Sequence, residues 1–135
     1  MNTAHPFAFL AAGAILAGCA SHPYMTPSAA CRSSPCDATV TVQSCGKIQV
    51  TPDPIVVANG NKPVMRWTLE TSGWSFTDNG IDILKPGGQF DGKAKESARS
   101  FKWKNNNSMP GTYKYDVYVT DGSTTCRYDP TIVNQ

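Results

Sequence analysis

Hydrophobic and polar residues alternate through most of the chain beyond residue 36, with the period of two that a half-buried strand requires. The clearest run is PGTYKYDVYV, residues 110–119, which follows a Pro-Gly turn. Its polar face carries Lys114, Asp116 and Thr120. Its apolar face is made of Tyr113, Tyr115, Val117 and Val119. We expect this strand to be central and the earlier segments to pack against it.

Similar short segments, separated by turn residues, precede this strand. Their apolar positions are Val40 and Val42, Ile48 and Val50, Ile55 and Val57, Met65, Trp67 and Leu69, Trp74 and Phe76, Ile81 and Ile83, and Phe101 and Trp103. Many short strands with turns between them predict an all-β sandwich. Residues 93–99 (KAKESAR) are the one segment with helix propensity, enough for one or two turns. Residues 130–135 are predicted to add a last edge strand.

The start of the chain has the layout of an export signal. Residues 7–16 (FAFLAAGAIL) form an apolar run that is shorter than the about twenty residues that span a bilayer. The run ends in small residues before Cys19, which predicts a signal peptide over residues 1–18. The first six residues contain His5 and no Lys or Arg, whereas the start of a signal peptide usually carries positive charge.

The sequence Leu16-Ala17-Gly18-Cys19 resembles a bacterial lipobox, in which the cysteine thiol receives a diacylglycerol after cleavage. The resemblance implies a lipoprotein anchored through Cys19. Because Ala20 rather than Asp follows this cysteine, the resemblance also implies the outer membrane, with the domain facing the periplasm. An ordinary signal peptide with a chance cysteine is the alternative. We predict a flexible tether over residues 19–30, rich in Ser, Pro, Thr and Ala, and a folded domain over residues 31–135.

Four cysteines remain in the mature chain, and an even number in an exported protein predicts two disulfides. Cys36 and Cys45 flank a strand-like segment, whose extended length of about 3.3 Å per residue keeps them too far apart to pair. Pairing Cys31 with Cys45 would require residues 31–36 to fold back along that strand. We therefore expect Cys31 to pair with Cys36, and Cys45 with Cys126.

The composition argues against nucleic-acid binding and against catalysis. The net charge of +2 is too small to indicate a nucleic-acid partner. Acidic residues are scattered singly, and the mature chain has one histidine, His22, which falls in the tether. Asp78 and Asp82 lack the ligand count of a calcium loop and are interpreted as solvated carboxylates of a polar turn. We therefore predict a protein that is not an enzyme and holds no cofactor.

Two stretches resemble the cupredoxin family, a Greek-key β-sandwich. IQVTPDPIVVANGNKPVMRWTL resembles the family's opening strands, turn and V-x-W strand. FKWKNNNSMPGTYKYDV resembles its F-x-F strand, Pro-Gly-x-Tyr turn and penultimate strand. The resemblance implies a cupredoxin-like fold, and an immunoglobulin-like sandwich is the alternative.

The copper ligands of that family are missing from this sequence. A type 1 copper site needs a cysteine thiolate and two imidazoles. Trp74 stands about where the family has its first histidine, Val117 stands where it has the cysteine, and no histidine follows. We expect no bound metal, with a copper-binding electron-transfer protein as the rival hypothesis.

A basic segment is the one candidate binding surface. Six cations lie between residues 85 and 104, next to aromatic residues: Lys85, Lys93, Lys95, Arg99, Lys102 and Lys104. Together with Trp74 they would suit an anionic envelope polymer or an acidic protein patch. The alternative is a solvated strand face whose lysines guard an edge. Exposure of Trp74 or Tyr118 would favour a contact surface.

These observations predict a non-catalytic, lipid-anchored module of the cell envelope that binds a partner or has a structural role. We expect the protein to be attached to the membrane through its N-terminal lipid. The expected partner is an envelope protein or an anionic polymer. A periplasmic accessory or inhibitor subunit remains a further alternative.

Overall fold

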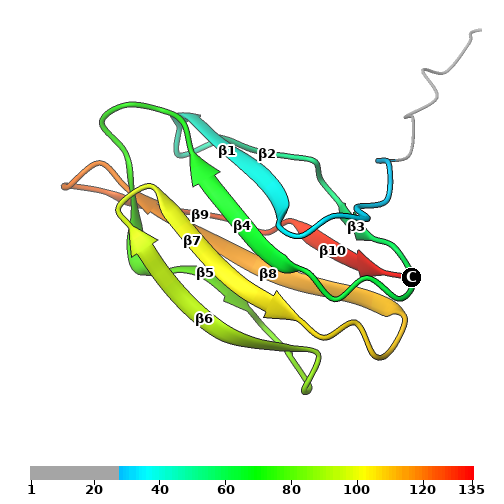
Figure 1. The fold of residues 1–135 in the computed structure, drawn as a ribbon. Coiled ribbons are helices and arrows are strands. Elements are labelled where there is room, and N and C mark those ends of the chain that lie inside the picture. Colours follow the sequence, from blue (N-terminus) through cyan, green and yellow to red (C-terminus); the bar gives the residue numbers. More distant parts are fainter. Residues whose placement is uncertain (1–27) are drawn as a thin grey trace, which may run out of the picture.

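The structure, a computed structural model, describes residues 28–135. In this range the chain is all-β, with two sheets packed face to face and no helix (Figure 1). The ten strands are β1 (Cys36–Ser44), β2 (Lys47–Thr51), β3 (Ile55–Val57), β4 (Val64–Leu69), β5 (Ser75–Ile83), β6 (Phe90–Ser97), β7 (Ser100–Asn105), β8 (Gly111–Thr120), β9 (Thr125–Tyr128) and β10 (Thr131–Asn134). The predicted signal peptide, the lipidation site at Cys19 and most of the tether lie outside the described residues.

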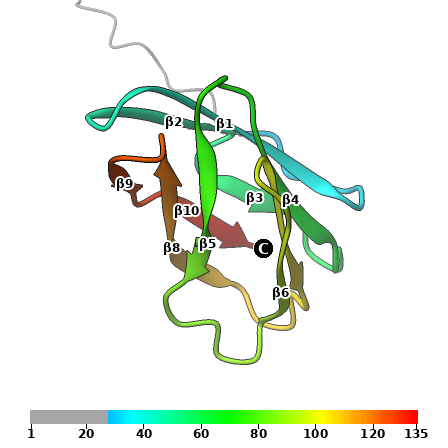
Figure 2. The same ribbon diagram turned by 90° about the vertical axis from the view of Figure 1, so that its left-hand side faces the viewer.

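The two sheets have different strand orders. The first sheet runs β2-β1-β4-β7-β6, and the second runs β3-β10-β8-β5. The β1–β4 and β3–β10 pairs are parallel, and the other pairs are antiparallel. β9 pairs with the second half of β8, and β10 pairs with its first half. The two short strands are separated at Pro130. Figure 2 shows the two layers from one end.

The core lies between the sheets and is formed by the alternating apolar residues of both. Trp67 and Tyr115 are fully buried, and their rings meet edge to face with centroids 5.4 Å apart. The Trp67 Nε1–H also donates a hydrogen bond of 3.2 Å to the Tyr115 hydroxyl. Burial raises the pKa of the Tyr115 hydroxyl well above its usual value. The predicted sandwich and the inward position of these aromatic residues are confirmed.

Both predicted disulfides are present. Cys31 pairs with Cys36, and Cys45, in the β1–β2 turn, pairs with Cys126 on β9. The second bond joins the two sheets across a sequence separation of 81 residues. In the chain-entropy description a loop of that length stabilises the folded state by about 4 kcal/mol.

The expectation of a helical turn over residues 93–99 is wrong. Most of this segment belongs to β6, which pairs with β7 along the open edge of the first sheet. Helix propensity is a weak local preference of under about 1 kcal/mol per residue, and pairing with β7 outweighs it. Two irregularities in the β6–β7 register leave this strand bulged.

Two other segments differ from the expectation in detail. Residues 77–80 form no turn, because β5 is one strand with a bulge between Phe76 and Ile81. A Cβ atom on Gly80 would lie 2.7 Å from Phe76 Cβ, so the bulge requires glycine. The C-terminal segment is also not an edge strand, because β10 lies between β8 and β3.

Candidate binding surface

The six cations of the basic segment do not lie on one common surface. Two of them, Lys93 and Lys95 on β6, reach across the edge of the sandwich to β5. Lys93 Nζ lies 2.9 Å from Asp82 Oδ1 and 5.6 Å from the centre of the Trp103 ring. Lys95 Nζ lies 3.1 Å from Asp78 Oδ1. We call Lys93, Lys95, Asp78, Asp82 and Trp103 the edge group, because they close the gap between the two sheets.

Arg99 and Lys104 bind main-chain oxygens. Arg99 lies in the β6–β7 turn, and its guanidinium donates to the carbonyl oxygens of Leu69, at 2.8 Å from Nε, and of Glu70. These hydrogen bonds satisfy the main-chain carbonyl groups at the end of β4. Lys104 Nζ donates to the Lys62 carbonyl oxygen at 2.9 Å. Lys85 lies apart from both, in the β5–β6 loop.

Lys102 belongs to a charged row on the outer face of the first sheet. Its Nζ lies 3.1 Å from Glu96 Oε1, on the neighbouring strand β6. Across the other neighbour, Arg66 on β4 is its direct cross-strand partner. Arg66 Nε in turn lies 2.9 Å from Asp37 Oδ1 on β1. We call Asp37, Arg66, Lys102 and Glu96 the face group, in which two cations lie between two carboxylates.

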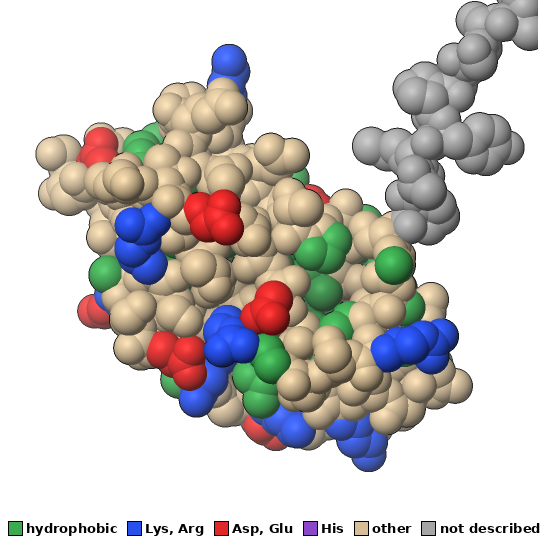
Figure 3. Space-filling model, turned by 45° about the horizontal axis from the view of Figure 1, so that its top comes forward, with side chains coloured by type: hydrophobic (Ala, Val, Ile, Leu, Met, Phe, Trp, Pro, Cys, Tyr) green, Lys and Arg blue, Asp and Glu red, His purple; other side chains and the backbone are tan. Residues whose placement is uncertain are grey.

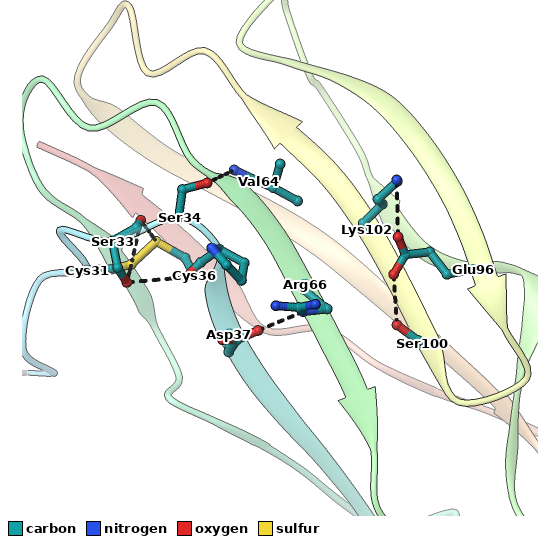
Figure 4. A network of polar contacts seen from close by, with 11 residues as sticks. Cys31, Ser33, Ser34, Cys36, Asp37, Val64, Arg66, Glu96, Ser100 and Lys102 are labelled. Carbon is teal, nitrogen blue, oxygen red and sulfur yellow. Dashed lines mark hydrogen bonds and ion pairs between the residues drawn. A yellow bond between two sulfur atoms is a disulfide. The ribbon is translucent and has the colours of Figure 1, made fainter.

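A shallow hollow of about 240 Å³ opens over the face group. In Figure 4 the disulfide loop lies on one side and the Lys102–Glu96 pair on the other, with Val64 and Arg66 between them. The residues that line it are Ser34, Pro35, Val64, Arg66, Glu96 and Lys102. The Cys31–Cys36 disulfide closes the loop, and Ser34 Oγ accepts the Val64 N–H at 3.0 Å, which holds the loop against the start of β4.

The electrostatics of this face are local. Positive and negative side chains lie close together over the central part of the face visible in Figure 3. Glu96 accepts from Lys102 through one oxygen and from the Ser100 hydroxyl, at 3.1 Å, through the other. These two hydrogen bonds, with Lys102 first, hold the pKa of Glu96 below its ordinary value. The surface therefore offers a small charged site and not a broad cationic patch.

Trp74 and Tyr118 are less available than a contact surface requires. Trp74 is partly buried and packs against the core. The Tyr118 hydroxyl donates to Asp116 Oδ2 at 3.0 Å, and the pKa of Tyr118 is raised chiefly by this bond to a carboxylate. Asp116 was predicted on a solvated face, yet its side chain is buried and lies 2.8 Å from Arg127 on β9. Only the β8–β9 register brings that pair together.

One end of the sandwich contains a cluster of buried amide side chains. Asn105 Nδ2 donates to Asn134 Oδ1 at 2.8 Å, and the Asn107 side chain donates to the carbonyl oxygen of Ala58. Gln89 Oε1 accepts the main-chain N–H groups of residues 108 and 109, which ties the β5–β6 loop to the β7–β8 loop. We call Gln89, Asn105, Asn107 and Asn134 the amide cluster.

The amide cluster connects these loops to the point where the chain enters the domain. Asn107 Nδ2 donates to the Asn61 carbonyl oxygen, and Asn61 Nδ2 donates to the Cys31 carbonyl oxygen. The two large hydrophobic side chains that are exposed in the described part of the chain, Leu84 at 48% and Met109 at 60%, are carried by the same pair of loops. Asn61 therefore connects the β7–β8 loop to the entry point at Cys31.

Trp74 and Val117, the positions at which the cupredoxin resemblance would place copper ligands, both pack against the core. Val117 is fully buried between the sheets, and Trp74 packs against the core cluster. Within residues 28–135, no three His, Cys, Asp or Glu side chains gather as a metal site would require. No helix in this range is long and apolar enough to cross a membrane.

No protein-family model matches the sequence, and no curated protein sequence is significantly similar to it.

Proposed function

We propose that this protein is a lipid-anchored, non-catalytic binding module of the bacterial envelope. In this proposal Cys19 carries the lipid, and a short tether holds the β-sandwich at the periplasmic side of the outer membrane. The domain engages its partner through the outer face of the first sheet. The observation that carries the binding role is the hollow over the face group, where Arg66 and Lys102 lie side by side on a rigid sheet.

The construction of the entry end supports the anchored arrangement. The proposed tether would leave the domain at Cys31, and hydrogen bonds through Asn61 and Asn107 fix this residue to the β7–β8 loop.

The order of the strands agrees with the cupredoxin resemblance where the sequence motifs match. β2, β3 and the turn at Asn59–Asn61 lead into β4, which carries the V-x-W-like segment with Trp67. The F-x-F-like segment is β7, and the Pro-Gly-x-Tyr turn leads into β8. This supports a cupredoxin-like scaffold in which Trp74 and Val117 take the ligand positions. A stoichiometric blue absorption band on copper titration would contradict this part of the proposal.

The anchor is tested by Cys19→Ser. We expect this variant to accumulate as an unprocessed precursor and to incorporate no labelled palmitate, because the modified thiol is absent. Cys45→Ser is the matched control: it should lose the inter-sheet disulfide and stability but keep processing and lipid labelling. Normal maturation and membrane attachment of Cys19→Ser would contradict the lipoprotein proposal.

A further inference from the structure

The hollow over the face group points to a specific kind of ligand, and the inference rests on the proposed binding role. Arg66 and Lys102 are direct partners in the antiparallel β4–β7 pair, which places their Cβ atoms about 5 Å apart. Like charges in this arrangement destabilise a sheet. The carboxylates that offset them, Asp37 and Glu96, lie at the two outer ends of the row, so the centre of the row stays positive.

The hollow presents hydrogen-bond donors that the described residues leave free. A guanidinium has five N–H donors and an ammonium has three. Arg66 gives its Nε–H to Asp37, and Lys102 gives one hydrogen to Glu96. Ser34 Oγ accepts from Val64, so its own hydrogen is available. Both Glu96 oxygens, by contrast, already accept hydrogen bonds. The site is therefore complementary to an acceptor, and an anionic acceptor fits two adjacent cations.

The size and the lining of the hollow narrow the class of ligand. The volume of about 240 Å³ is below the about 300 Å³ at which pockets enclose a whole small ligand, so the hollow accommodates one end of a longer molecule. The Glu96 carboxylate at the wall repels a doubly charged phosphate more than a singly charged carboxylate. Pro35 and Val64 supply apolar contact for a small side chain beside that carboxylate, and no aromatic ring lines the hollow for a sugar to stack on.

We propose that the hollow over the face group binds the C-terminal carboxylate of a peptide whose last residue is small and apolar. The Nη donors of Arg66 and the ammonium of Lys102 hold the carboxylate oxygens by charge-assisted hydrogen bonds. The Ser34 hydroxyl donates to the same group, and Pro35 and Val64 contact the terminal side chain. Both cations have side chains that are 42% exposed, so they are accessible without any rearrangement.

The test is a titration of the full-length, ¹⁵N-labelled protein with N-acetyl-alanyl-alanine, followed by NMR. We expect saturable shifts at the Arg66 side-chain Nε and at the amides of residues 64–66 and 100–102. For a probe of this size the dissociation constant should be on the order of millimolar. Binding should weaken as salt is added, because both cations are exposed.

Three matched measurements decide the assignment. The C-terminal amide of the same dipeptide should bind the wild-type protein at least about tenfold more weakly than the acid does. The acid should bind the Arg66→Gln and Lys102→Gln variants at least about tenfold more weakly than the wild type. In each case one charge-assisted hydrogen bond is lost. Lys47→Gln removes an exposed cation from β2 and should change nothing. Equal binding of the amide, or tighter binding of glucuronate or inorganic phosphate, would overturn the peptide assignment.

The result of this titration is independent of the test of the lipid anchor. The titration reports on the domain whether or not Cys19 carries lipid. Absence of any shift at Arg66, with normal lipid labelling of the wild type, would reject the ligand and leave the anchored module standing. Failure of lipid labelling, with the expected shifts in the titration, would reject the anchor and leave the ligand assignment standing.

Discussion

The edge group and the face group both place cations beside carboxylates, but the two groups have different roles. In the edge group the Lys93 ammonium faces Asp82 and the Trp103 ring, and each lysine bridges two strands that belong to different sheets. In the face group Arg66 and Lys102 lie on one sheet, next to each other. The edge cations therefore stabilise the fold, whereas the face cations lie where the fold gains least from them. The predictions below separate the two groups, and they run from the largest effect to the smallest.

Trp103→Phe should produce the largest change, because it removes the polar contact at the centre of the edge group. Trp103 Nε1–H donates to the buried carbonyl oxygen of Ile81 at 2.9 Å. Losing this donor leaves a buried acceptor unpaired, and we expect about 2 kcal/mol lower free energy of unfolding. Urea denaturation measures the difference. Tyr113→Phe is the control, since its hydroxyl makes one 3.4 Å contact at the surface and should cost under about 0.5 kcal/mol.

Lys93→Met should lower the free energy of unfolding by about 1 kcal/mol. The substitution keeps most of the aliphatic stem but removes both the ion pair with Asp82 and the cation–π contact with Trp103. Lys95→Met is the matched comparison on the same strand. Asp78 is fully exposed, so this variant should lose less than about 0.5 kcal/mol. Equal losses in both variants would show that the Trp103 contact contributes nothing.

Lys102→Gln should leave stability within about 0.5 kcal/mol of the wild type. It loses a partly exposed ion pair with Glu96, but it also removes the like-charge neighbour of Arg66, and the two effects oppose each other. Thermal unfolding at two salt concentrations measures this balance. A loss as large as that of Lys93→Met would mean that the face group serves the fold, contrary to the comparison.

Glu96 should titrate below the ordinary range of a glutamate. Its hydrogen bonds from Lys102 and Ser100 favour the ionised form and lower its pKa. With a pKa lowered in the folded state, the contribution of Glu96 to stability is present above the unfolded pKa and is lost as the pH falls through the folded pKa. The carboxyl ¹³C shift gives the midpoint, which Lys102→Gln should raise. A midpoint unchanged by that variant would exclude Lys102 as the main cause.

The inward faces of the strands were predictable, because burial in a sandwich follows the period of two in the sequence. Trp67, Phe101 and Val117 all lie where alternation placed them. The disulfides were also predictable, because an extended segment fixes the distance between Cys36 and Cys45. Both results depend on local geometry alone.

Features that depend on how the strands pair were not predictable from local sequence. The bulge in β5 and the strand character of β6 come from contacts with β8 and β7, which outweigh the local preference of residues 77–80 and 93–99. The Arg66–Asp37 pair joins residues 29 positions apart through the parallel β1–β4 register. The antiparallel β4–β7 register sets Arg66 opposite Lys102, and without it Arg66 had no visible link to the basic segment.

The basic segment itself shows why sequence proximity is a poor guide to a surface. Lys93 and Lys102 are nine positions apart, yet the β6–β7 hairpin sends one side chain to the sandwich edge and the other to the outer face. The hollow also needs the disulfide loop at Ser34 as a wall, and the expected Cys31–Cys36 pairing alone did not reveal this role.

The most direct test compares two double variants for binding of N-acetyl-alanyl-alanine, at a temperature where both are folded. Arg66→Gln with Lys102→Gln should reduce the affinity at least about tenfold, and Lys93→Gln with Lys95→Gln should leave it within about twofold of the wild type. Both variants remove two positive charges, so a nonspecific charge effect would lower both affinities equally. Equal loss in the two variants, or loss in the edge variant alone, would contradict the assignment of binding to the outer face of the first sheet.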